Sequence, residues 1–151
     1  MYAQAHPEML DGIVAIAPYL GEPELHAEIA RSGGLMRWEA VSPGAPAESA
    51  PSSQAPRSLS ASRRAGAGSL TGDKTDELYL RKLWVWLRGY GEHGGDRPPL
   101  WLGWGTQDSF AKPCRLLAEA LPLGQAVARR SDHSWSTWLP LMTELRRRAW
   151  P

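Results

Sequence analysis

The 151-residue chain has little of several features that mark particular protein classes. Its one cysteine, Cys114, can form no internal disulfide, which favours a reducing compartment. Its net charge of +1 provides no bulk field to attract nucleic acid or an anionic membrane. Its apolar runs fall far short of the ~20 residues that a membrane-spanning helix needs, and its first residues do not read as a signal peptide. We therefore expect a cytoplasmic protein with no membrane span and no nucleic-acid partner.

The sequence also lacks the patterns of a metal or cofactor site. His6, His26 and His93 show no ligand spacing with one another or with Cys114. No glycine-rich phosphate loop is present. Cys114 falls in the first turn of an expected helix beside apolar residues, which favours a buried structural thiol over a nucleophile. We expect no cofactor and no metal.

What the chain does contain is an alternation of strand and helix patterns. Runs 13–17, 100–105 and 125–129 are typical of buried strands, because they are short, apolar or alternating, and bounded by turn residues. Such alternation predicts an α/β fold with a parallel sheet. Helical patterns are expected at 1–9, at 22–37, from about 76, at 113–121, and in a last helix with Trp138, Leu141, Met142 and Leu145 on its apolar face.

Two details concern where these helices end. Gly89 and Gly91 are expected to terminate the helix that begins near Asp76. Pro140 is expected to be tolerated in the last helix only within its first turn, because proline removes a helical hydrogen bond and clashes with the preceding turn.

Residues 41–72 consist mostly of Ser, Ala, Pro and Gly. They cannot bury enough apolar surface to offset about 1–2 kcal/mol of backbone entropy per residue. We expect a disordered insert within a single domain that spans residues 1–151.

A carboxylate and a histidine follow two successive expected strands. Asp108 comes just after 100–105, and His133 comes just after 125–129. Carboxyl ends of parallel strands are where open α/β sheets place their chemistry, and this pair can form the acid and base of a Ser-His-Asp relay. Asp108 as a helix cap and His133 as an ordinary loop residue are the alternatives. Asp132 could compete with Asp108 as the carboxylate.

Three segments carry a resemblance to a known family: residues 2–18 (YAQAHPEMLDGIVAIAP), 101–108 (WLGWGTQD) and 131–138 (SDHSWSTW). They resemble the second half of an α/β-hydrolase of the serine esterase type. The resemblance covers about 1–21 and 76–148. It implies a partial α/β-hydrolase fold of about three parallel strands, with the insert in the lid region. It places Asp108 at the acid position and His133 at the base position, and it implies a small ester-like substrate for the full-length form.

The family's nucleophile turn, Gly-x-Ser-x-Gly, is absent from the sequence. Ser109, Ser131, Ser134 and Ser136 adjoin the acid or the base, but none lies in such a turn. A base with no hydroxyl to deprotonate forms no acyl-enzyme, so we expect the chain alone to be inactive. Two alternatives are a non-catalytic remnant that serves as an interaction module and a half-domain completed by a separate chain.

The resemblance has two further implications. Tyr19, Trp38, Trp84, Trp86 and Trp135 could line a substrate pocket, although core packing is the favoured alternative for most of them. The strand at 13–17 would lack its neighbour on one side. An unpaired apolar edge invites self-association or pairing with another chain.

Overall fold

The computed structural model describes residues 2–40, 72–92 and 97–150. It has an α/β fold with one three-stranded parallel sheet in the order β1-β2-β3. The strands are β1 (Ile13–Ile16), β2 (Leu100–Gly105) and β3 (Ala126–Arg129). The predicted parallel sheet with flanking helices is confirmed. Residues 41–71 of the predicted insert lie outside the described residues, and Gly72 already belongs to a helix.

Five α-helices and two short 3₁₀ segments surround the sheet in the described residues. They are α1 (Tyr2–Ala5), η1 (Pro7–Met9), α2 (Pro23–Arg31), η2 (Leu35–Arg37), α3 (Gly72–Glu92), α4 (Ala111–Ala118) and α5 (Trp135–Ala149).

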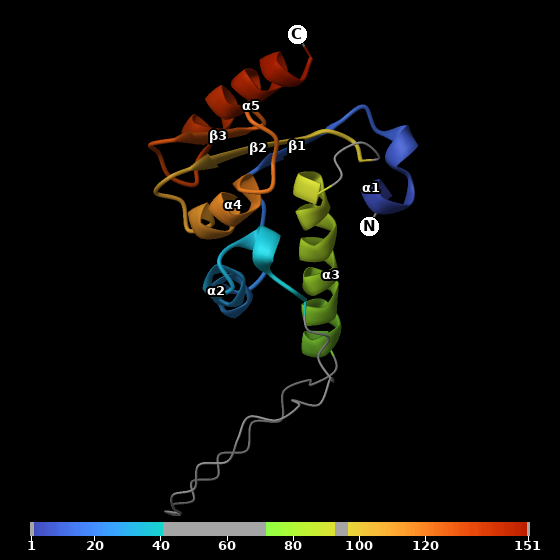
Figure 1. Cartoon of the computed structure of the whole chain (residues 1–151). Coiled ribbons are helices and arrows are strands. Elements are labelled where there is room, and N and C mark those ends of the chain that lie inside the picture. The colour runs from blue at the N-terminus through green and yellow to red at the C-terminus, as the bar shows by residue number, and fades with distance from the viewer. Residues whose placement is uncertain (1, 41–71, 93–96, 151) are drawn as a thin grey trace, which may run out of the picture.

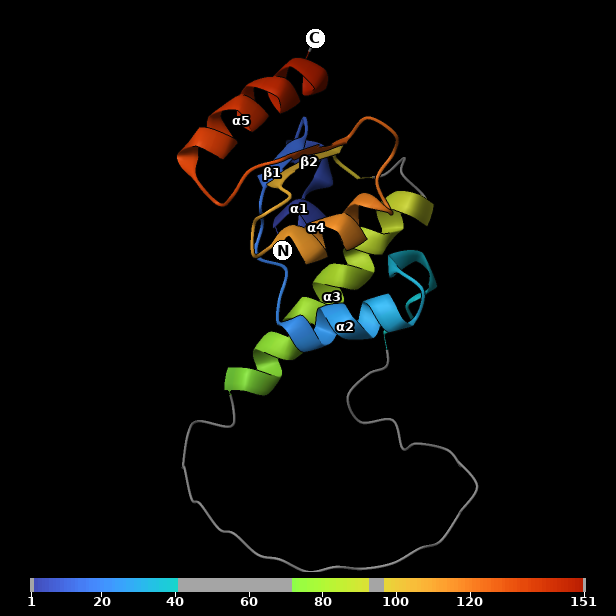
Figure 2. The same ribbon diagram turned by 90° about the vertical axis from the view of Figure 1, so that its left-hand side faces the viewer.

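The elements form layers, which Figures 1 and 2 show from two sides. Helix α5 covers one face of the sheet and α4 covers the other, α2 packs against α4, and the long helix α3 lies on the same side of the sheet as α4 and α2. The layers follow from the two-residue period of β2. Gly103 faces Leu141 and Leu145 of α5, whereas Leu102 and Trp104 belong to the core on the α4 side.

The main core is built from the helices and from β2. Its fully buried members include Leu102, Leu117 of α4, Ile29 of α2 and Trp84 of α3. The Trp84 indole N–H donates to the Leu20 carbonyl at 2.8 Å, so its polar atom is satisfied within the core.

Helix α3 does not stop at Gly89 or Gly91, as expected from the sequence, but continues through both to Glu92. The two glycines leave space for neighbouring side chains and do not end the helix. A Cβ on Gly91 would lie 2.6 Å from the sulfur of Met36, and one on Gly89 would lie 2.2 Å from the guanidinium of Arg97. Tertiary packing therefore explains these residues better than their low helix propensity does.

Two prolines also sit differently from expectation. Pro113 is the third residue of α4, which begins at Ala111 rather than at the proline. Pro140 is the sixth residue of α5, beyond its first turn, so the expectation for this proline was wrong. The helix continues past the missing amide because Leu141 and Leu145 are fully buried against the sheet.

The first two expected helices are shorter than predicted. The pattern at 1–9 splits into α1 and η1 at Pro7, because the residue before a proline avoids the helical region. The pattern at 22–37 is interrupted by Gly33 and Gly34, whose φ angles of +89° and +101° end α2 before η2 begins.

Strand β1 is an edge of the sheet. The Ile13 amide donates to Pro99 at 2.7 Å and the Ala17 amide donates to Gly103 at 2.8 Å, so alternate residues face β2. The backbone groups of Val14 and Ile16 therefore point away from β2. No partner for these groups lies within the described part of the chain.

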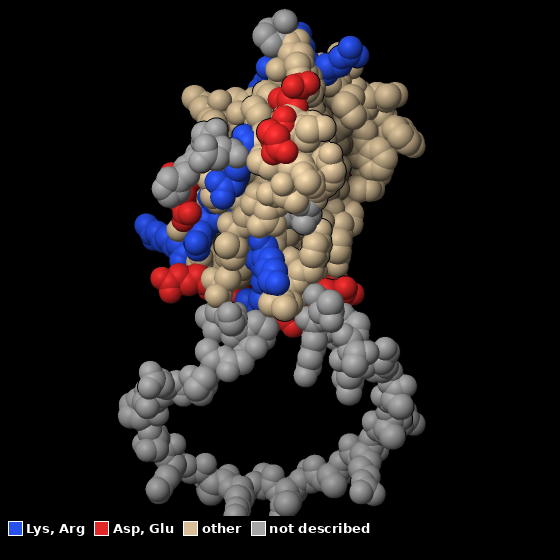
Figure 3. Space-filling view, turned by 90° about the vertical axis from the view of Figure 1, so that its right-hand side faces the viewer, with Lys and Arg blue, Asp and Glu red and all other residues tan. Residues whose placement is uncertain are grey.

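Charge is mixed on the surface. In Figure 3, basic and acidic side chains intermingle on one side of the visible face, and much of the rest of that face carries neither. Among the described residues, no helix has the length and apolar character required to traverse a membrane.

Candidate active site

The structure brings Asp108 and His133 together at one edge of the sheet. Asp108 follows β2 after the turn at Thr106 and Gln107, and His133 follows β3. Because β2 and β3 are adjacent and parallel, their carboxyl ends present both side chains at the same edge. The Nδ1 atom of His133 lies 2.7 Å from Oδ2 of Asp108.

The two carboxylate oxygens of Asp108 have different partners. Oδ1 accepts the backbone N–H of Phe110 at 2.8 Å, and Oδ2 faces His133. The Asp108 side chain has no exposed surface, whereas 39% of the His133 side chain is exposed. Because a carboxylate only accepts hydrogen bonds, Nδ1 of His133 is the donor. This tautomer leaves the lone pair of Nε2 free.

Backbone contacts between the two loops set this geometry. The Thr106 amide donates to Arg129 at 2.7 Å, and the Gln107 amide donates to Ser131 at 2.9 Å. Gly105 allows the closest approach, because a Cβ there would lie 2.4 Å from the Ser131 carbonyl oxygen and 2.6 Å from that of Asp132. This close approach at Gly105 was not predicted from the sequence, since only the folded loop reveals the contact.

Two aromatic rings hold the imidazole of His133. Phe110 meets it edge-on at a centroid distance of 5.3 Å, and Trp138 of α5 does so at 4.7 Å. Trp138 in turn packs against Trp135 at 5.0 Å. These contacts, together with the hydrogen bond to Asp108, favour one orientation of the ring.

Asp132, the competing carboxylate, is directed elsewhere. Its Oδ1 accepts the hydroxyl of Ser134 at 2.5 Å and that of Thr137 at 3.3 Å, at the start of α5. The hydrogen bond from Ser134, assisted by that from Thr137, lowers the pKa of Asp132. The His133 ring is bonded to Asp108.

Cys114 lies buried in α4 on the same side of the sheet as Trp104. Burial raises the pKa of its thiol to about 12, and the charge of Asp108 adds to the shift. A thiol held in its protonated form is a poor nucleophile, in agreement with the structural role inferred from the sequence.

None of the four nearby serines hydrogen-bonds to the imidazole in the described structure. The Ser109 hydroxyl points to Asp108 Oδ1 at 3.4 Å, and that of Ser131 points to the Arg129 carbonyl at 3.5 Å. Ser134 and Ser136 bond to each other at 2.8 Å. A nucleophile is therefore not assembled among these hydroxyls.

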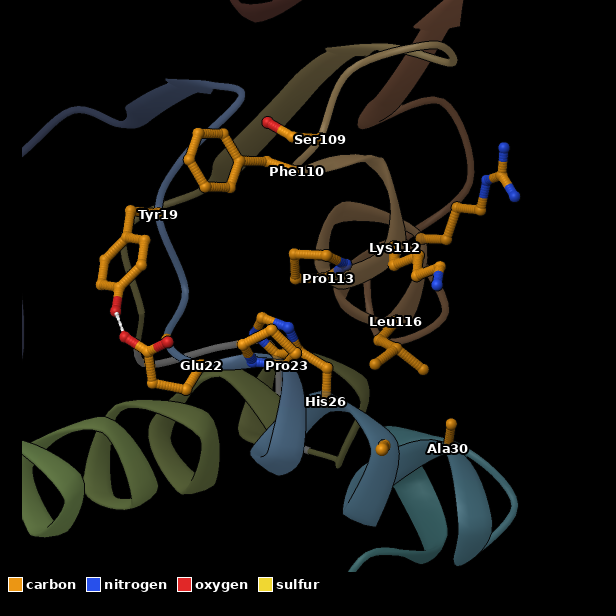
Figure 4. A pocket seen from close by; sticks show the side chains of 13 residues that line it. Tyr19, Glu22, Pro23, His26, Ala30, Ser109, Phe110, Lys112, Pro113 and Leu116 are labelled. Carbon is orange, nitrogen blue, oxygen red and sulfur yellow. Dashed lines mark hydrogen bonds between the residues drawn. The ribbon is translucent and has the colours of Figure 1, made fainter.

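A pocket of about 740 Å³ lies beside this pair, between α2 and α4 (Figure 4). Phe110 connects the two features, because it lines the pocket and also contacts the His133 ring. The other lining residues come from the turn before α2, from α2 itself, and from α4 with the loop before it. They are Tyr19, Gly21, Glu22, Pro23, His26, Ala27, Ala30, Ser109, Lys112, Pro113, Arg115 and Leu116.

The aromatic residues named from the sequence are dispersed. Tyr19 lines the pocket, where its hydroxyl donates to Glu22. Trp38 and Trp84 are 1% and 0% exposed in the core and are not among the lining residues. Trp135 is 70% exposed at the start of α5, next to Trp138 rather than in the pocket. The apolar lining from α2 and α4 was missed, because alanine, proline and leucine on short helices give no functional signal.

Within ranges 2–40, 72–92 and 97–150, no group of three or more His, Cys, Asp or Glu side chains is arranged to hold a metal ion.

Comparison with protein-family models, with curated proteins and with solved structures finds no match to this chain.

Proposed function

We propose that this chain carries the acid and base of a serine hydrolase that acts on carboxylic esters. The observation that supports the proposal is the hydrogen bond of 2.7 Å between His133 and a fully buried Asp108. A buried carboxylate that faces a partly exposed imidazole is the arrangement that general-base catalysis requires. The resemblance of 2–18, 101–108 and 131–138 to the serine esterases supplies the reaction class.

In this mechanism Nε2 of His133 removes the proton from an attacking hydroxyl, which adds to the ester carbonyl. The resulting imidazolium is stabilised by Asp108, which keeps the ring in its Nδ1–H tautomer. His133 then returns the proton to the departing alcohol and later activates the water that hydrolyses the acyl-enzyme. The attacking hydroxyl comes from a Gly-x-Ser-x-Gly turn, which this sequence lacks.

The proposal therefore predicts that the purified chain does not hydrolyse esters by a serine mechanism. A fluorophosphonate probe should leave it unlabelled, and p-nitrophenyl butyrate should be hydrolysed no faster than in buffer alone. Covalent labelling of any serine would contradict the absence of a nucleophile.

A positive test uses the coding DNA directly upstream of codon 1. If that frame encodes Gly-x-Ser-x-Gly before the segment 2–18, the longer product should hydrolyse p-nitrophenyl butyrate. Its His133→Ala variant should then lose several orders of magnitude in kcat while it keeps its fold. An unchanged kcat would exclude His133 as the base.

A non-catalytic interaction module is the second candidate, and the outward-facing backbone of Val14 and Ile16 favours it. An upstream sequence unrelated to a nucleophile turn, together with concentration-dependent association of the chain, would support this alternative.

A further inference from the structure

The pocket between α2 and α4 is not used by the Asp108–His133 pair, although it begins one aromatic ring away from it. Phe110 meets Tyr19 edge-on at 6.1 Å on the pocket side and His133 at 5.3 Å on the other side. Figure 4 shows the pocket enclosed by Phe110, Tyr19, Pro113 and Leu116, with α2 below. Its volume of about 740 Å³ lies within the range of small-molecule sites.

The walls of the pocket are largely hydrocarbon. Helix α2 contributes Pro23, Ala27 and Ala30, and α4 contributes Pro113 and Leu116. Such walls favour an apolar chain, because its burial removes hydrocarbon surface from water at about 25 cal/mol per Å².

The charges on the lining are unequal. Lys112 and Arg115 are exposed on α4, and neither forms an ion pair with a described residue. Glu22 is the acid among the described lining residues, and its carboxylate accepts the Tyr19 hydroxyl at 2.5 Å. His26 adds no cation at neutral pH, because burial lowers the pKa of its imidazole. The lining thus offers two cations against one acid that already has a hydrogen-bond donor.

We infer that this pocket binds the acyl chain of an ester, and that the end of this chain remote from the ester group is anionic. The chain would lie along α2 and α4, and its anionic end would meet Lys112 and Arg115. The identity of the ligand as an ester rests on the proposed function. Its ester group would lie at the Phe110 end, next to His133. The preferred substrates would then be half-esters of dicarboxylic acids rather than neutral esters.

Binding can be measured without hydrolysis. Three methyl esters share a chain of eight carbons and differ in the group at the far end, which is anionic in monomethyl suberate, neutral in dimethyl suberate and cationic in methyl 8-aminooctanoate. Titrations of the full chain would follow the methyl resonances of Leu116, which is in the pocket. We expect monomethyl suberate to bind about tenfold more tightly than the neutral diester and the amine to bind most weakly. Added salt should weaken binding of the half-ester but not of the diester.

Charge-reversal variants provide the matched comparison. Lys112→Glu with Arg115→Glu should reverse the order of the three esters. Lys82→Glu with Arg146→Glu, which changes the net charge equally outside this pocket, should leave the order intact. Both double variants alter exposed helical positions, so circular dichroism should report an unchanged fold.

A blocking variant tests the location of binding. Ala27→Trp, or Ala30→Phe if the first variant folds poorly, should abolish binding of all three esters. Equal affinity for the half-ester and the diester, or no shift of the Leu116 methyl groups with any ester, would overturn the inference. These titrations measure binding and not hydrolysis, whereas the catalytic proposal fails if His133→Ala leaves the kcat of the longer product unchanged, so the two failures give different results.

Discussion

Asp108 and His133 share a hydrogen bond but differ in exposure: the carboxylate is fully buried, and the imidazole remains partly open to solvent. The burial of Asp108 leaves the Phe110 amide and the imidazole as its principal partners. Nδ1 of His133 is engaged by Asp108, whereas its Nε2 forms no hydrogen bond with a described residue.

Asp108→Asn should change the tautomer of His133. An asparagine that keeps its bond to the Phe110 amide presents an NH₂ group to Nδ1, which must then accept, so the proton moves to Nε2. Nitrogen-15 NMR of the imidazole should show Nδ1–H in the unaltered chain and Nε2–H in the variant. Asp132→Asn is the control, because its carboxylate contacts Ser134 and Thr137. The same His133 tautomer in the unaltered chain and in Asp108→Asn would contradict the assigned hydrogen bond.

Gly105→Ala should separate Asp108 from His133. The new methyl group would lie 2.4 Å and 2.6 Å from two backbone carbonyl oxygens, which cannot move aside as a side chain can. We expect a loss of about 1–3 kcal/mol in the free energy of unfolding, measured in urea, and a changed His133 NMR signal.

Gly103→Ala is the matched control for that variant. It lies on the same strand and face, but its methyl group would meet a flexible side-chain carbon of Leu145 at 2.9 Å. This variant should lose less unfolding free energy than Gly105→Ala and leave the His133 NMR signal unchanged. Equal effects of the two alanines would show that the loop at 131–132 does not depend on Gly105.

The position of the Asp108–His133 pair could be predicted from the sequence, whereas its fine geometry could not. Asp108 and His133 each follow a short strand, and parallel strands bring such residues to one edge. The contact at Gly105 depends on the path of a loop, which residue patterns do not encode. For the same reason, Gly89 and Gly91 indicated a helix end, although the neighbouring Met36 and Arg97 explain them.

The pocket was harder to predict than the pair. Tryptophans are conspicuous in a sequence, but Trp38 and Trp84 are buried in the core. Which face a helical residue presents to a cavity depends on how the helices pack, and the small residues of α2 gave no signal. The family resemblance and the expected cytoplasmic location stay predictions.

Cys114 should resist thiol reagents in the folded chain. With a pKa of about 12 and no exposed surface, its thiol stays protonated and covered at pH 8. Ellman's reagent should therefore react with no thiol in buffer and with one thiol in concentrated urea, since this is the only cysteine. Rapid reaction in buffer would contradict the burial of α4 against the sheet.

Glu28 should contribute stability that acid removes. Its carboxylate accepts two hydrogen bonds from Arg81 of α3, at 2.8 and 2.6 Å, and one from the Trp38 indole at 2.8 Å. The bonds from Arg81 lower the pKa of Glu28 below its ordinary 4.5 in the folded state. The contribution is therefore complete above pH 4.5 and disappears as the pH falls through the lower folded value.

Glu28→Gln tests this contribution. At pH 7 the variant should lose about 1 kcal/mol of unfolding free energy. The difference between the two proteins should shrink as urea titrations are repeated from pH 5 towards pH 3. Glu24→Gln is the control on the exposed side of α2. A difference that stays constant across this range would mean that the ion pair with Arg81 is not the cause.

Val14→Pro should reduce self-association if the edge of β1 mediates it. The amide of Val14 points away from β2, so proline removes a donor from the open edge and not from the β1–β2 ladder. Sedimentation velocity should show concentration-dependent dimers for the unaltered chain and for Val14→Thr, which keeps the amide, but fewer for the proline variant. A monomer at all concentrations would exclude this edge as an interface.

The main-chain bonds that join the turn after β2 to the segment after β3 have an evolutionary consequence. The two hydrogen bonds join the backbone amides of Thr106 and Gln107 to the backbone carbonyls of Arg129 and Ser131. None of these four side chains is therefore needed to hold the two segments together. Relatives could exchange those side chains freely, and thereby alter what approaches the imidazole, without altering how far it stands from the carboxylate. Substitutions at these four positions would then change the side chains around His133, while the geometry of the Asp108–His133 pair stays the same.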